Sequence, residues 1–317
     1  GPKKTVQYLN ELSQKFGNCH DNAHLAGRYA FEVYDEQSFK LCGAECHSGC
    51  YHGATEAYFR DHGTENLSEN LNLLCGSELN GFFTHQCIHG IGHGLMAWTS
   101  YDLPDALKSC DLLKERQDSC WTGVFMENIV GGLSKEEVDK GGDADHFTKY
   151  LSDDPQFPCT DVEEKYKNAC YFLQTDRMLR LAGGDYRNFK KVSEGCLMVE
   201  KSYQQSCFES MGRTVGGAYP KSAIGAIAAC YNAPKGLPRI GCLNGAVQNT
   251  LWDPTGQDDA LAFCSMLSDK EEKDSCYNTI FSRAKEVFTS VDDLKSFCYK
   301  AESQYQNICP NTLSMAK

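Results

Sequence analysis

The histidines of this chain are concentrated near its N-terminus. Eight of the nine lie between His20 and His93, and only His146 lies beyond them. His85, His89 and His93 are spaced four residues apart, which places them on one face of a helix. Neutral imidazoles at this spacing can bind one transition-metal ion together. The spacing therefore predicts a metal site in this segment.

The four-residue spacing also occurs earlier in the chain. His24 follows His20 by four residues, and Glu56 follows His52 by four residues. If the helices that carry these pairs stack on one another, their side chains converge on one point. Several imidazoles with a carboxylate suit zinc or copper, with non-haem iron as the alternative. The predicted metal ligands are His24, His52, His85, His89 and His93.

Two glutamates are candidates for the catalytic role at this site. Glu56 could be a ligand or a general base, and Glu127 lies in the next helix pair, where it could adjoin the metal. The chain contains no H-E-x-x-H, G-x-S-x-G, P-loop or G-x-G-x-x-G motif, so no familiar hydrolase, kinase or dehydrogenase is indicated. The alternative to a metal site is a packed or pH-sensing histidine cluster.

Three glycines interrupt the histidine segment. Gly90, Gly92 and Gly94 each cost a helix about 1 kcal/mol relative to alanine, so each needs a compensating reason. Gly90 follows the second cysteine of its pair by three residues, a position that indicates close packing common to the repeats. Gly92 and Gly94 predict the close approach of a neighbouring segment or a ligand. The glycines that share the position of Gly90 are Gly53, Gly123 and Gly245.

The cysteines define the elements that must position these residues. Fourteen of the eighteen form seven pairs spaced 10 to 12 residues apart, and the first members of the last four pairs are each 34 residues apart. This period predicts an all-α fold, a right-handed α-solenoid of two-helix repeats of about 34 residues, each with its own disulfide. The pairs are Cys75/Cys87, Cys110/Cys120, Cys159/Cys170, Cys196/Cys207, Cys230/Cys242, Cys264/Cys276 and Cys298/Cys309.

The remaining cysteines extend this framework. We predict Cys42/Cys50 as one bridge, nearly one period before Cys75, and Cys19/Cys46 as the ninth. Such regular pairing indicates an oxidising, extracytoplasmic compartment: secreted, periplasmic or at the cell surface. An acidic residue or asparagine five positions before the first cysteine is a predicted helix cap. These caps are Asn70, Asp105, Asp154, Asp259 and Asp293.

We predict one solenoid domain over residues 1–317. Residues 1–100 carry the histidine-rich units, and residues 159–317 form the regular C-terminal repeats. The interval from Cys110 to Cys159 exceeds the period by about 15 residues, and this surplus lies in the segment 133–158. We interpret it as a solvated acidic insertion, with a lid or a calcium loop as the alternative.

The period and the cysteine placement resemble Sel1-like and other tetratricopeptide-type repeats, particularly secreted cysteine-rich forms in which each helix pair carries a disulfide. The resemblance covers roughly residues 40–317 and departs from that family in its wider cysteine spacing. It implies an α-solenoid and no catalytic residue.

A mostly polar stripe on the second helix of each repeat predicts a concave groove that binds a small molecule, a peptide or a glycan. The alternative is a stripe that only faces solvent. The residues predicted to bind substrate in this groove are Asn128, Asp176, Arg177, Arg213, Gln248 and Asn249.

The net charge of −12 argues against nucleic acid or an anionic membrane as partner. The chain contains no run of 18 apolar residues, so we expect no membrane span. The first hypothesis is an extracytoplasmic metalloenzyme, either a hydrolase or an oxidoreductase, with its metal at the N-terminal end of the groove. The alternatives are a non-enzymatic peptide- or glycan-binding scaffold and a metal carrier or sensor.

Overall fold

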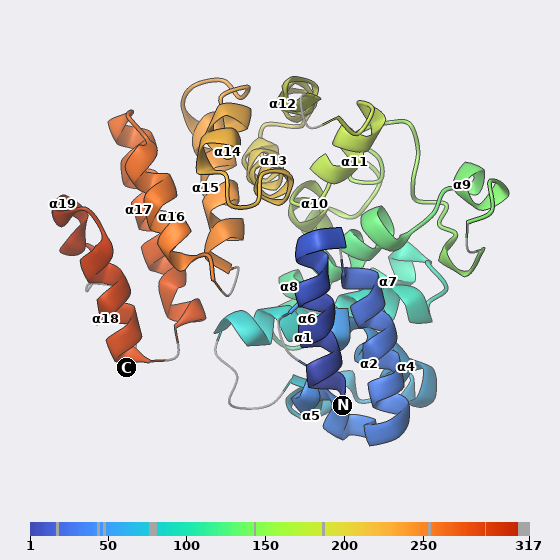
Figure 1. Cartoon of the computed structure of the whole chain (residues 1–317). Coiled ribbons are helices and arrows are strands. Elements are labelled where there is room, and N and C mark those ends of the chain that lie inside the picture. The colour runs from blue at the N-terminus through green and yellow to red at the C-terminus, as the bar shows by residue number, and fades with distance from the viewer. Residues whose placement is uncertain are drawn as a thin grey trace. The chain divides into compact units, whose positions relative to one another are not determined.

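The computed structural model describes residues 1–16, 19–42, 45–46, 49–75, 81–142, 144–185, 188–252, 255–288 and 290–309. These residues form helices and turns, and no strand occurs among them; an isolated β-bridge joins Leu133 and Phe147 (Figure 1). The prediction of an all-α fold is confirmed for this part of the chain. The right-handed superhelix and the 34-residue structural repeat stay predictions.

The chain forms two compact units. Unit 1 comprises residues 1–152 and 161–170, and unit 2 comprises residues 153–160 and 171–317. The helices of unit 1 are α1 (Pro2–Phe16), α2 (His20–Tyr34), α3 (Ser38–Leu41), α4 (Gly49–His62), α5 (Leu67–Cys75), α6 (Gly81–Trp98), α7 (Leu103–Cys110), α8 (Gln117–Met126) and α9 (Lys135–Asp139). Helix α10 (Glu164–Tyr171) follows, and unit 2 contains α11 (Thr175–Leu181), α12 (Phe189–Met198), α13 (Gln204–Ala218), α14 (Ala223–Cys230), α15 (Leu237–Trp252), α16 (Gln257–Met266), α17 (Lys270–Val287), α18 (Val291–Lys300) and α19 (Ser303–Gln306).

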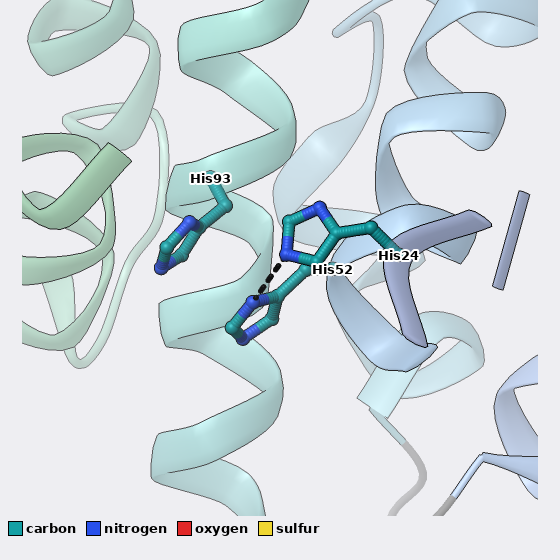
Figure 2. Close-up of side chains that lie close together, drawn as sticks. All are labelled: His24, His52 and His93. Atoms are coloured by element: carbon teal, nitrogen blue, oxygen red, sulfur yellow. Dashed lines mark hydrogen bonds between the residues drawn. The ribbon is translucent and has the colours of Figure 1, made fainter. Parts of the chain in front are cut away.

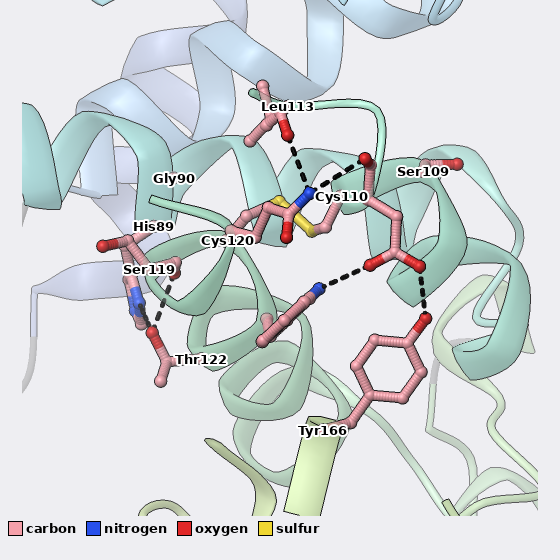
Figure 3. Close-up of a disulfide and its surroundings, with 12 residues drawn as sticks. His89, Gly90, Ser109, Cys110, Leu113, Ser119, Cys120, Thr122 and Tyr166 are labelled. Carbon is pink, nitrogen blue, oxygen red and sulfur yellow. Dashed lines mark hydrogen bonds between the residues drawn. A yellow bond between two sulfur atoms is a disulfide. The ribbon is translucent and has the colours of Figure 1, made fainter. Parts of the chain in front are cut away.

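Five of the disulfides join a shorter helix to the longer helix that follows it. Cys110 is the last residue of α7, and its partner Cys120 lies in the first turn of α8 (Figure 3). Cys19–Cys46 and Cys42–Cys50 are both bonded as predicted. Cys159 and Cys170 are also disulfide-bonded, and no cysteine of the chain is free. The further bonded pairs are Cys75–Cys87, Cys196–Cys207, Cys230–Cys242, Cys264–Cys276 and Cys298–Cys309.

Two of the predicted helix caps, Asp105 and Asp293, lie three residues after the residue that caps the helix. The side chain of Asp102, and not that of Asp105, caps α7, because it accepts a hydrogen bond from the Asp105 backbone N–H. Ser290 caps α18 in the same way through the N–H of Asp293. Asp105 and Asp293 instead lie in the first turn, where a negative charge is stabilised by the helix dipole.

Within each unit the longer helices pack directly on one another. In unit 1, α2 contacts α4, α4 contacts α6, and α6 contacts α8; in unit 2, α13 contacts α15 and α15 contacts α17. This stacking lets residues on successive helices share one face. It is the arrangement that the histidine prediction required.

Glycines set the short distance between these helices. A Cβ atom at Gly53 of α4 would lie 1.9 Å from the carbonyl oxygen of His24 on α2. A Cβ at Gly123 of α8 would lie 1.9 Å from that of His89 on α6, and one at Gly92 would lie 2.1 Å from that of Cys120. The segment predicted to approach Gly92 is therefore the backbone of α8. The histidine-bearing helices cross at a spacing that only glycine permits.

Candidate metal centre

Three histidines from three stacked helices meet inside unit 1. His24 of α2, His52 of α4 and His93 of α6 each present a ring nitrogen, and these atoms all lie within 4.8 Å of one another (Figure 2). The three residues are at most 8 % exposed. The rings of His52 and His93 stack with centroids 4.1 Å apart, and a Cβ at Gly90 would touch His52 Cδ2 at 3.0 Å. The group could hold a metal ion.

Carboxylates orient two of these imidazoles. His24 Nδ1 lies 2.8 Å from Glu56 Oε1, and His93 Nδ1 lies 2.6 Å from Glu127 Oε2. Arg28 donates from Nε to the second oxygen of Glu56 at 2.5 Å. A carboxylate accepts a hydrogen bond from Nδ1–H, which leaves the Nε2 lone pair of a neutral ring directed away from the carboxylate. Such carboxylate–histidine pairs accompany the histidine ligands of metal sites.

Both carboxylate oxygens of Glu127 are engaged in hydrogen bonds. Tyr101 donates its hydroxyl to Glu127 Oε1 at 2.6 Å, opposite the bond to His93. Glu127 opens the π-helical turn Glu127–Gly131 that continues α8, and π turns often occur at functional sites. A Cβ at Gly131 would lie 2.0 Å from Glu127 Oε1, so this glycine makes room for the carboxylate.

The buried groups have shifted pKa values. Burial alone raises the pKa of Glu127, but the hydrogen bond and charge of His93, the charge of His24 and the Tyr101 hydroxyl outweigh it and hold the pKa far below its usual range. Burial lowers the pKa of His24, but the Glu56 carboxylate outweighs burial and raises the pKa above 6.5. Burial and Glu127 raise the pKa of Tyr101. The carboxylates therefore favour positive charge at the centre of the cluster.

One residue of the insertion, His146, contacts this network. His146 Nδ1 lies 2.9 Å from the Tyr101 hydroxyl and 3.1 Å from the carbonyl oxygen of Gly131. The half-buried His146 ring is thereby linked through Tyr101 and Glu127 to His93. Neither Tyr101 nor His146 is among the residues predicted from the sequence. The isolated position of His146, the one histidine beyond His93, was the signal available.

The remaining histidines of the α6 series lie beside the cluster. His89 is buried and places its Nε2 atom 3.2 Å from His93 Nε2. His85 is half-buried, and its Nδ1 atom lies 2.8 Å from the Ser119 hydroxyl. The three-histidine group comprises neither of them. The predicted set of five is thus arranged as a central triad, an adjacent His89 and a peripheral His85. The side chain of His20 lies outside the described residues.

The residues predicted to bind substrate fall in both units. Asn128 of unit 1 is fully buried and bonds to Thr148 Oγ1 and to the carbonyl oxygen of Tyr150, contacts that hold the insertion in place. In unit 2, Arg213 pairs with Asp176 at 2.7 Å, and Arg177 lies 3.9 Å from Asp153. Gln248 and Asn249 are half-buried on α15. A shared groove for these residues stays a prediction.

None of the family models, curated proteins or solved structures compared with this chain matches it. The resemblance to Sel1-like repeats therefore stays a prediction. The nine disulfides suggest an oxidising, extracytoplasmic environment. Among the described helices, none has both the length and the apolar character needed to cross a bilayer.

Proposed function

We propose that this chain is an extracytoplasmic metalloprotein that binds one transition-metal ion at His24, His52 and His93. The observation that carries the proposal is the pairing of the Nδ1 atoms of His24 and His93 with buried carboxylates. This pairing keeps the Nε2 atom of each ring away from the carboxylates, and His24 Nε2 lies 3.2 Å from His52 Nδ1. Glu56 and Glu127, predicted as catalytic, are assigned here to orienting these ligands, because each carboxylate has both oxygens engaged.

The spacing of the nitrogens supports the same assignment. His52 Nδ1 and His24 Nε2 are 3.2 Å apart. Two nitrogens bound to one tetrahedral ion at 2.0–2.1 Å are separated by about 3.3 Å. This separation matches one edge of that tetrahedron, and the ligand atoms of all three histidines lie within 4.8 Å of one another. Zinc and copper both accept such imidazole ligands.

A metalloenzyme is the more specific form of this proposal. The chain of hydrogen bonds from half-buried His146 through Tyr101 and Glu127 to His93 supports it, because it offers a route for protons between the ion and the protein surface. The ligands are buried, so the reacting molecule at the ion would be small, such as water or dioxygen. The same metal site would serve a hydrolase, an oxidoreductase, a metal carrier or a metal sensor.

Elemental analysis of the purified protein tests the proposal. We expect one transition-metal ion per chain, lost in His52→Ala and in His93→Ala. His62→Ala is the matched control, because His62 belongs to α4 but contacts Tyr58, so the ion should be retained. A wild-type protein that binds no metal, even after incubation with zinc or copper, would contradict the proposal and favour the scaffold hypothesis.

A further inference from the structure

The hydrogen atoms around His89 can be assigned from its neighbours. The Thr122 hydroxyl donates to the carbonyl oxygen of Ser119 at 2.8 Å, so its oxygen can only accept from a further partner (Figure 3). His89 Nδ1 lies 3.1 Å from that oxygen, and we assign Nδ1–H as the donor to it. A neutral His89 ring then carries its lone pair on Nε2.

Two electron-pair donors lie close to this nitrogen. His89 Nε2 lies 3.2 Å from His93 Nε2, whose ring already donates from Nδ1 to Glu127. It also lies 3.4 Å from the sulfur of Met126, an acceptor that carries no hydrogen. Lone pairs that face one another at these distances repel unless a proton or a metal ion lies between them. Two imidazoles and a thioether form a soft donor set.

We propose, on the basis of the proposed metal function, that His89, His93 and Met126 form a copper(I) position next to the three-histidine group. Thioether and imidazole ligands together select copper(I) over zinc. His93 belongs to both sets and its single lone pair binds one ion at a time. The two positions are therefore alternatives for one ion, and copper(I) and zinc compete for the protein.

The charges around the cluster agree with a monovalent ion. Glu56 and Glu127 contribute two negative charges, and Arg28, paired with Glu56, contributes one positive charge. With neutral imidazoles the net charge of these groups is −1, which copper(I) neutralises. A zinc ion would leave a net charge of +1 in a buried region, where unbalanced charge is costly.

Metal competition on the whole oxidised protein tests the assignment. Copper(I), supplied anaerobically without thiols, is titrated against bathocuproine disulfonate, and zinc is titrated against a zinc chelator. Met126→Leu conserves side-chain volume and should weaken copper(I) binding about tenfold or more, as loss of a direct ligand costs at least as much as loss of an outer one. Its zinc affinity should stay within about twofold of wild type.

Two further variants complete the design. His24→Gln should weaken zinc and leave copper(I) nearly unchanged, the opposite pattern to Met126→Leu. Met96→Leu replaces another methionine, buried in α6, and should alter neither affinity. X-ray absorption of the copper(I) form should show a sulfur neighbour that is absent in Met126→Leu.

The outcomes separate this inference from the function on which it rests. If wild type binds metal and loses it on His52→Ala, but Met126→Leu leaves copper(I) affinity and its absorption spectrum unchanged, the copper(I) position is wrong and the metal function stands. A proton shared between His89 and His93 would give that result. If wild type binds neither ion, both proposals fail.

Discussion

At the scale of single residues, hydrogen-bond direction decides which imidazole nitrogen faces the centre. His24 and His93 both use Nδ1 for a carboxylate, so their Nε2 atoms face other imidazoles: His24 Nε2 lies 3.2 Å from His52 Nδ1, and His93 Nε2 lies 3.2 Å from His89 Nε2. The sequence places these histidines on successive helices, but it does not show which nitrogen points inward. That choice depends on Glu56 and Glu127, which approach from neighbouring helices 32 and 34 residues away in the chain.

Glu127→Gln tests this dependence. The amide can donate to His93 Nδ1 and so favour the tautomer whose Nε2 carries a hydrogen and cannot bind metal. We expect metal affinity to fall by about 10- to 100-fold in a chelator competition, because outer partners of ligating histidines have effects of this size. Glu136→Gln, at an exposed site in α9, is the control and should leave affinity unchanged. Equal affinity in both variants would contradict an orienting role for Glu127.

At the scale of helices, glycine pairs repeat the same close crossing in both units. A Cβ at Gly212 of α13 would lie 2.0 Å from the carbonyl oxygen of Cys242, and one at Gly245 of α15 would lie 2.1 Å from that of Glu209. These contacts correspond to those of Gly92 and Gly123 in unit 1. The crossing is thus a structural property of the helix pairs, and only unit 1 among the described residues places histidines beside it.

Two alanine substitutions in α13 measure the cost of this crossing. Gly212→Ala should destabilise the protein by about 1–3 kcal/mol, because the new methyl group meets the backbone of α15. Gly217→Ala lies in the same helix with no atom within 4 Å of its Cβ, and it should be neutral or stabilising by up to about 1 kcal/mol. Urea unfolding measures both. An unchanged free energy of unfolding in Gly212→Ala would mean that α13 and α15 can move apart without loss of stability.

The cap of α17 provides a prediction on pH. The side-chain bond to Lys235, the backbone N–H groups of Glu271 and Glu272, and the charge of Lys235 lower the pKa of Asp269 below 3.8. Because the folded pKa is the lower one, this carboxylate adds stability above about pH 3.8 and loses it as the pH falls through the lowered pKa.

Asp269→Asn retains a capping side chain but removes the charge. The difference in urea midpoint between wild type and Asp269→Asn should be constant near neutral pH and disappear in acid. Asp259→Asn, an exposed acidic residue of α16, controls for the loss of one negative charge. A midpoint difference that persists unchanged below the lowered pKa would show that Asp269 acts without its charge.

At the scale of the whole molecule, disulfides provide much of the stability. Nine bridges link neighbouring segments, and eight of them close loops with sequence separations of 8 to 27 residues. Each such bridge contributes about 2–4 kcal/mol by restricting the unfolded chain. The net free energy of unfolding of a protein is only about 5–15 kcal/mol, so the summed contribution of the nine disulfides exceeds it.

Complete reduction should therefore unfold the chain. After treatment with a thiol reductant and alkylation, we expect loss of most helical signal in circular dichroism at 25 °C. Protein treated with the alkylating agent alone is the control and should remain helical, since no cysteine is free to react. Retention of the helical spectrum after full alkylation would show that packing alone supports the fold.

The sequence by itself determined the helical class, the disulfide pairs and the histidines that share a face. These follow from local spacing, because helix periodicity and short cysteine loops depend on residues close together in the chain. Only the tertiary structure added Tyr101 and His146 to the site. Tyr101 contacts Glu127, which is 26 residues away in the chain, and His146 contacts Tyr101, which is 45 residues away. It also placed Met126 beside His89 and distinguished the central triad from His85. Such contacts depend on how helices pack, and no spacing along one helix encodes them.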